Sequence, residues 1–89
     1  MTYAVFLHPK AAKELERFDK EVRRAVLAKL RELRDDPEGV GVVLKYSHFH
    51  KIRIGDYRAI YEVYDKERKV VVLYIGHRKD VYDDFSKLI

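Results

Sequence analysis

The sequence predicts an α+β domain in which a helical hairpin packs on one face of a largely antiparallel sheet and leaves a basic face open. Three observations support this class. Apolar residues recur with helical spacing between residues 11 and 33, strand-like apolar runs follow from residue 42 onwards, and a short apolar run precedes the helices. The predicted order is β-α-α-β-β-β, and we assign all of it to a single domain, residues 1–89.

Residues 3–7 form the first predicted strand, which His8-Pro9 ends. Pro9 is suited to the first turn of a helix. The apolar positions of that helix have the spacing i, i+3 and i+4, and they are Ala11, Ala12, Leu15 and Phe18.

A second helix follows, with Asp19 as a possible N-cap. Its apolar stripe consists of Val22, Ala25, Val26, Leu30 and Leu33. Asp36-Pro37 and Gly39 end this helix, and residues 39–41 are predicted to form a loop.

Residues 50–58 predict a β-hairpin with Gly55-Asp56 as its two-residue turn. Such a turn fixes the register, so Ile54 lies opposite Tyr57. The helix-covered face of this hairpin then takes Ile52, Ile54, Tyr57, Ala59, Tyr61 and Val63.

The other face of the hairpin carries three cations. Arg53 lies opposite Arg58, and Lys51 shares their face because residues two apart in a strand point the same way. Charge on the open face of a sheet is usually no more than a solvated surface. Like charges directly opposite each other destabilise a sheet, however, so this pattern favours a polyanionic ligand.

Residues 59–64 continue the second strand of the hairpin, and residues 65–69 are predicted to form a polar turn. Residues 70–75 are apolar without interruption, which predicts an interior strand.

The register of this second hairpin decides where Arg78 lies. If Tyr64 pairs with Val70, Arg78 shares the face of Arg58. If Asp65 pairs with Val70, Arg78 points into the core, which is costly for arginine. We therefore predict the first register, or a bulge equivalent to it, and Arg78 joins the cationic set.

The chain has a formal net charge of +4 and a sequence pI of about 9.3, which favours nucleic acid or an acidic protein as partner. It has no cysteine, which excludes disulfides and thiolate metal sites. Without a long apolar run or a signal-like start, it is predicted to be cytoplasmic, with no membrane partner. Asparagine and glutamine are absent while 38% of residues are charged, which is typical of proteins that work at high temperature.

The histidines carry weaker signals. His48 and His50 could offer two metal ligands, but no third ligand is evident, so we expect no metal and no cofactor. His77 could act as an acid or base or have a structural role.

A cluster of cations can also support chemistry. RNA is cut without metal when a base takes the 2′-OH proton, cations stabilise the phosphorane, and an acid protonates the leaving 5′-oxygen. Arginine suits the clamping roles through its rigid fork of donors. DNA lacks the 2′-OH, so the same surface could bind DNA without cutting it.

The chain resembles the RelE/ParE toxin superfamily over nearly its whole length. The resemblance rests on the predicted element order and on two motifs, Lys51-Ile52-Arg53-Ile54-Gly55-Asp56-Tyr57-Arg58 and Gly76-His77-Arg78…Val81-Tyr82. It implies a toxin of a type II toxin-antitoxin system with a cognate, RelB-like antitoxin. RelE-type members are ribosome-dependent endoribonucleases that cut mRNA in the A site, whereas ParE-type members inhibit DNA gyrase.

Carried over by position, the resemblance implies catalytic roles for five residues. Lys51, alone or with Tyr82, is the candidate base for the 2′-OH. Arg53, Arg58 and Arg78 would hold the scissile phosphate. Arg53 stands where well-studied bacterial enzymes have lysine, and the spacing from Arg78 to Tyr82 is shorter than in some members.

Three functions remain open at this point. The first is a metal-independent mRNA interferase whose partners are an antitoxin, the ribosome and mRNA, and the presence of Lys51 and Tyr82 favours it. The second is a ParE-like gyrase inhibitor without nuclease chemistry. The third is a catalytically weak module that binds nucleic acid or its antitoxin.

Overall fold

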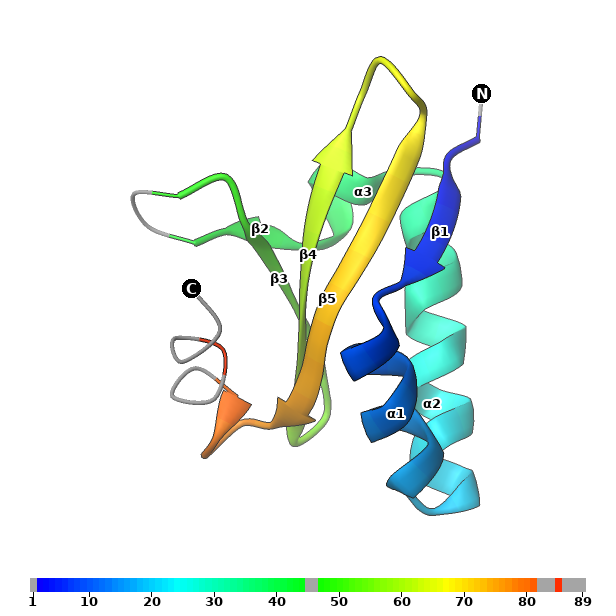
Figure 1. The fold of residues 1–89 in the computed structure, drawn as a ribbon, viewed down its shortest axis with the longest axis vertical. Coiled ribbons are helices and arrows are strands. Elements are labelled where there is room, and N and C mark those ends of the chain that lie inside the picture. The colour runs from blue at the N-terminus through cyan, green and yellow to red at the C-terminus, as the bar shows by residue number, and fades with distance from the viewer. Residues whose placement is uncertain (1, 45–46, 82–84, 86–89) are drawn as a thin grey trace.

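The computed structural model describes residues 2–44, 47–81 and 85, and within them one mixed sheet carries helices on one side (Figure 1). The helices are α1 (Pro9–Arg17), α2 (Lys20–Arg31), the 3₁₀ turn η1 (Glu32–Arg34) and α3 (Pro37–Val40). The strands are β1 (Ala4–Leu7), β2 (Val42–Val43), β3 (His50–Ile54), β4 (Tyr57–Tyr64) and β5 (Lys69–His77). The predicted α+β class is confirmed.

The two long helices begin where the sequence indicates. Pro9 stands in the first turn of α1, and the Nδ1 atom of His8 accepts a hydrogen bond from the Lys10 N–H at 3.2 Å. Asp19 is the N-cap residue of α2, although its side chain makes no capping hydrogen bond. Ala25, which we placed on the apolar stripe, is exposed, because consecutive residues of a helix are about 100° apart and its neighbour Val26 takes the buried position.

Residues 37–40 form the short helix α3, so the prediction of a loop over residues 39–41 was wrong in part. The Asp36 carboxylate accepts a hydrogen bond from the Gly39 N–H at 2.9 Å, and Pro37 occupies the first helical turn. The Asp-Pro pair that ends the preceding helical segment therefore also starts the next one.

The sheet has the strand order β1-β5-β4-β3-β2. β1 runs parallel to β5, and the other neighbouring strands are antiparallel. β5 lies between β1 and β4, so its predicted interior position is confirmed.

The β3–β4 hairpin has the predicted register, with Ile54 opposite Tyr57 and Arg53 opposite Arg58. Gly55 has a φ of 58° at the first central position of the turn, the conformation that makes glycine favourable there.

The β4–β5 hairpin reaches the predicted alignment through a bulge. At the turn Tyr64 pairs with Lys69, one residue short of the predicted partner. Leu73 is then an extra residue on β5, so that Arg58 lies opposite Gly76.

The main core lies between the sheet and the helices. Its buried members are Ala11, Leu15, Val26, Leu30, Leu33, Ile52, Ile54, Ala59, Tyr61, Val70, Val72 and Ile75. Four of the six hairpin residues predicted for the helix-covered face belong to this set, while the other two, Tyr57 and Val63, pack against it partly buried.

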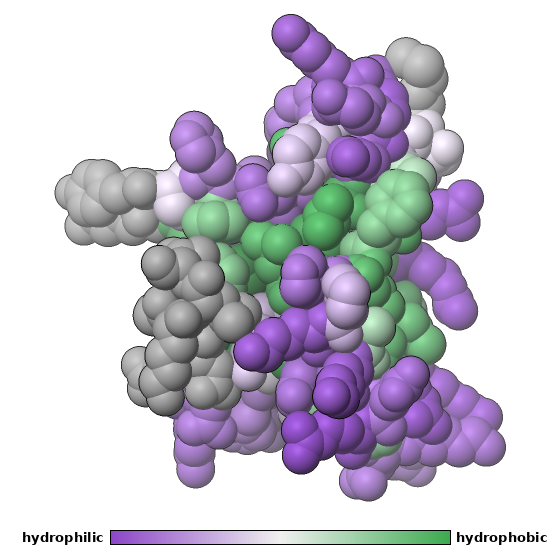
Figure 2. All heavy atoms as spheres, in the orientation of Figure 1, coloured by the Kyte–Doolittle hydropathy of each residue, from purple (hydrophilic) through white to green (hydrophobic). Residues whose placement is uncertain are grey.

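The opposite face of the sheet is not entirely open, in contrast to our prediction. Val81 and Phe85 fold back over β4 and β5 and bury Ile60 and Tyr74. In the view of Figure 2, apolar surface crosses the middle of the molecule, with hydrophilic surface above and below it. The helices that the structure describes include none that is long and apolar enough to cross a membrane.

Candidate functional site

Strand pairing arranges the predicted cations in two neighbouring rows on the sheet face opposite the helices. The first row consists of Arg53, Arg58 and Gly76 on β3, β4 and β5. The second row consists of Val42, Lys51, Ile60 and Tyr74 on β2, β3, β4 and β5. Directly opposed residues share a face, so the three cations of the hairpin lie together as predicted.

The three cations line one cavity of about 340 Å³. Its lining residues are Val40, Gly41, Val42, Lys51, Arg53 and Arg58. Arg53 is exposed, whereas Lys51 and Arg58 are half-buried. One wall is therefore cationic and the other apolar, a combination that can hold an anion next to a less polar group.

Arg58 is oriented by the turn of its own hairpin. Its Nη1 atom donates hydrogen bonds to the carbonyl oxygens of Gly55 and Tyr57, both at 2.8 Å. A guanidinium has five N–H donors, so these two bonds leave donors for a bound anion.

Arg78 follows β5 and lies beside the same turn. Its backbone N–H donates to the Asp56 carbonyl at 2.8 Å, and its Nε atom is 3.8 Å from Oδ1 of Asp56. The Arg78 side chain is 54% exposed, so it is accessible to a large ligand. The register thus brings Arg78 next to the turn that holds Arg58, and its role in the cationic set stays a prediction.

The apolar wall of the cavity, formed by Val40, Gly41 and Val42, packs on the core residue Tyr61. The Tyr61 hydroxyl is in the core and donates to the Pro37 carbonyl at 2.6 Å. Burial raises the pKa of Tyr61 to about 12. A Cβ atom at Gly41 would collide with the Tyr61 hydroxyl and lie 2.6 Å from the Lys51 carbonyl, so this position requires glycine.

This wall is not among the features predicted from the sequence. A signal was present, because Gly41 interrupts an apolar run and Val42 is close enough in sequence to pair with the hairpin. Val42 pairs with Lys51, so the start of this run forms the edge strand β2.

The histidines have structural contacts. The Nδ1 atom of His77 accepts a hydrogen bond from the Lys79 N–H at 3.2 Å, and its ring meets Tyr57 edge-on, with 5.6 Å between centroids. The ring of His50 stacks on Tyr61 with 5.2 Å between centroids. Within residues 2–44, 47–81 and 85, no cluster of three or more histidines, aspartates and glutamates is placed to bind a metal ion. Tyr82, the remaining predicted site residue, lies outside the described residues.

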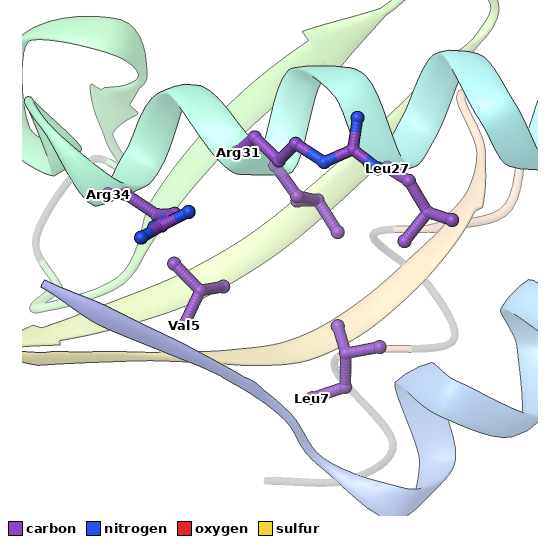
Figure 3. Close-up of a pocket in the computed structure, with 6 residues that line it drawn as sticks. Val5, Leu7, Leu27, Arg31 and Arg34 are labelled. Carbon is purple, nitrogen blue, oxygen red and sulfur yellow. The ribbon is translucent and has the colours of Figure 1, made fainter.

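A second concavity lies on the helix side of the sheet, between β1 and α2 (Figure 3). Val5 and Leu7 of β1 face Leu27 of α2 across it, and Arg31 and Arg34 stand along one rim. Its volume is about 280 Å³. Its floor is apolar, so it suits a protein segment better than a phosphate.

Comparison with known proteins identifies relatives of this fold. The family model described as "ParE toxin of type II toxin-antitoxin system, parDE" matches residues 5–82. No curated protein sequence matches the chain.

Solved structures of RelE toxins are similar to the chain over most of its length. A mutant of the E. coli toxin RelE in the free state has a TM-score of 0.79 and 27% identity, and covers 100% of this chain and 99% of its own. The Mycobacterium tuberculosis toxin-antitoxin complex RelBE2 contains a chain with a TM-score of 0.78 and 26% identity, and the match covers 88% of this chain and 100% of that one. The archaeal RelE-RelB complex from Pyrococcus horikoshii contains a chain with a TM-score of 0.75 and 29% identity, and the match covers 88% of this chain and 97% of that one.

Proposed function

The chain belongs to the ParE toxin family of type II toxin-antitoxin systems, within the RelE/ParE superfamily, and we propose that it is a toxin that cuts mRNA in the ribosomal A site. The observation that carries the proposal is the single cavity lined by Lys51, Arg53 and Arg58. RelE toxins are among the structures with more than 25% identity to this chain, which favours the RelE-type activity.

In this proposal Lys51 removes the proton of the ribose 2′-OH, alone or together with Tyr82. The 2′-oxygen then attacks the adjacent phosphorus, and the bond from phosphorus to the 5′-oxygen breaks. An acid gives a proton to that leaving oxygen. The reaction needs no other co-reactant, because one proton leaves the 2′-oxygen and one arrives at the 5′-oxygen.

The arginines act on the phosphate in this mechanism. Arg53 and Arg58 lie side by side across β3 and β4, which matches two oxygens of one phosphate or two successive phosphates. Arg78, beside the hairpin turn, would add a third cation as negative charge develops on the phosphorane. Arg53 serves as a clamp and not as a proton carrier, because arginine stays protonated.

Programmed ribosomes test the proposal directly. Ribosomes stalled on a defined message receive toxin that was freed of divalent metal with EDTA beforehand, and the message is mapped by primer extension. We expect cleavage within the A-site codon by the wild-type chain and cleavage about a hundredfold slower by Arg58→Ala. A message that stays intact, or cleavage that requires an added transition metal, would contradict the proposal.

A second candidate is inhibition of DNA gyrase, which the ParE description of the matching family model favours. The basic cavity would then bind a phosphate of DNA or an acidic surface without cutting. The two candidates differ in a supercoiling assay with purified gyrase. Inhibition of supercoiling together with an intact A-site message would favour this second function.

The proposed partner of the toxin is a cognate antitoxin, and RelB-RelE complexes are among the similar structures. We propose that the antitoxin covers the helix side as well as the basic face. The groove between β1 and α2 supports this, because its apolar floor and the rim of Arg31 and Arg34 fit an amphipathic segment with acidic residues.

A further inference from the structure

The turn Gly55-Asp56 contacts two of the proposed phosphate-binding arginines, which come from different strands. The carbonyl oxygens of Gly55 in the turn and of Tyr57 directly after it accept the two hydrogen bonds from Arg58 Nη1. Asp56 accepts the backbone N–H of Arg78 at 2.8 Å, and its carboxylate lies 3.8 Å from Arg78 Nε. The turn is thus the structural link between the end of β5 and the cationic row of β3 and β4.

We propose that Asp56 is a positioning residue for Arg78, and that its carboxylate holds the Arg78 guanidinium toward the scissile phosphate. This inference rests on the proposed mRNA cleavage. It adds to that proposal a residue of opposite charge, which does not itself bind RNA.

The contact has little value for stability, which makes orientation its main effect. The side chains of Arg78 and Asp56 are 54% and 68% exposed, and ion pairs between exposed groups contribute little to the free energy of unfolding. The backbone bond already fixes the main chain of Arg78 on Asp56. The carboxylate therefore restricts only the long side chain, whose free rotation would otherwise oppose ordered binding.

The geometry also leaves the useful donors of Arg78 available. The carboxylate approaches Nε, so the two terminal NH₂ groups of the guanidinium remain for phosphate oxygens. If Asp56 acted only as a negative charge, it would weaken RNA binding without helping the reaction. Its removal would then leave the cleavage rate unchanged or raise it.

This difference defines the experiment. Cleavage of A-site message is followed at increasing toxin concentration with the wild-type chain, Asp56→Asn and Asp56→Glu. For Asp56→Asn we expect a rate constant at saturation about three- to tenfold lower, with half-saturating toxin concentration unchanged or lower, because a negative charge beside RNA is removed. Asp56→Glu keeps the charge and is expected to restore most of the rate.

Two controls separate orientation from general effects. Asp35→Asn removes the same charge from an exposed aspartate next to α3, which lies at the opposite end of the sheet from this turn (Figure 1), and we expect wild-type kinetics. In an Arg78→Ala background, Asp56→Asn is expected to have no further effect on the rate, since the group that it positions is absent.

The outcomes are distinct. If the wild-type chain cuts and Asp56→Asn cuts at the same rate or faster, the positioning role is wrong. The same holds if Asp56→Asn lowers the rate equally in the presence and absence of Arg78. If the wild-type chain does not cut the message at all, the proposed function fails instead, and the positioning inference fails with it.

Discussion

Arg58 on β4 lies directly opposite Gly76 on β5, so the basic row ends at a position without a side chain. The space where a side chain at Gly76 would stand lies against Tyr74 and Val81. A Cβ atom there would lie 3.1 Å from Cε1 of Tyr74 and 3.5 Å from Cβ of Val81. Gly76 therefore leaves the position beside Arg58 open, and it also leaves room for Tyr74 and Val81 to pack in the apolar cluster.

Enlarging this residue should disturb both. We expect Gly76→Ala to lower the free energy of unfolding by about 1 kcal/mol and Gly76→Val by about 2–3 kcal/mol, because the added atoms meet Tyr74 and Val81. Urea denaturation measures the effect. Gly55→Ala is the matched control: its Cβ meets nothing within 4 Å, so its cost comes only from the φ of 58°. A Gly76→Val variant as stable as the wild type would show that Val81 does not pack here.

Removing the Arg58 guanidinium should slow cleavage strongly while the fold persists. We expect Arg58→Ala to lower the cleavage rate about a hundredfold, as the loss of a donor to developing charge does in other enzymes. Arg58→Lys should recover only part of the rate, because lysine cannot form the two bonds to the turn carbonyls together with a phosphate contact.

Single-turnover cleavage on ribosomes measures this effect, with circular dichroism as the check on folding. Arg24→Ala on the exposed side of α2 serves as control for the loss of one positive charge. Cleavage by Arg58→Ala within twofold of the wild-type rate would rule out the clamp.

The hairpin of residues 50–58 could be predicted in detail because a two-residue turn leaves one register. The β4–β5 connection could not be fixed in the same way. Its longer turn permits several pairings, and the bulge at Leu73 allows Val72 and Tyr74 to be buried in clusters on opposite faces of the sheet. The burial cost of Arg78 selected the correct alignment without locating the bulge.

Tyr61 should make stability depend on alkaline pH. Its pKa is about 12 in the folded protein and about 10 when unfolded, so the folded state holds the hydroxyl proton more tightly. The resulting stabilisation is complete below pH 10 and is lost as pH rises from 10 through 12. Its full size is up to about 3 kcal/mol.

Tyr61→Phe isolates this contribution. At neutral pH we expect a loss of about 1–2 kcal/mol, since the Pro37 carbonyl loses its donor. Above pH 10 the difference between wild type and variant should shrink. Denaturation series below and above pH 10 provide the measurement, and parallel pH profiles would contradict the assignment.

The groove between β1 and α2 predicts an effect on antitoxin binding that leaves cleavage intact. We expect Arg31→Glu combined with Arg34→Glu to weaken antitoxin affinity at least about tenfold, because two rim charges are reversed. Isothermal titration calorimetry with the cognate antitoxin tests this. Arg24→Glu, outside the groove, is the control, and equal affinity of all three proteins would place the antitoxin elsewhere.

The candidate site was predictable only in part, for a physical reason. Lys51, Arg53 and Arg58 belong to one local hairpin, so their common face follows from alternation. The wall formed by Val40, Gly41 and Val42 depends on Tyr61, which lies far away in sequence and reaches α3 through the core. A contact of this kind leaves no periodic pattern in the sequence.

The parallel pairing of β1 with β5 has a consequence for the order of folding. The hairpins β3–β4 and β4–β5 join neighbouring segments, whereas β1 and β5 come from opposite ends of the chain (Figure 1). Closing so long a loop costs entropy before any contact is gained, so we expect this pairing to form last. During synthesis on the ribosome β1 has no partner strand until β5 has been made. A nascent chain therefore completes its sheet only once β5 is available to pair with β1.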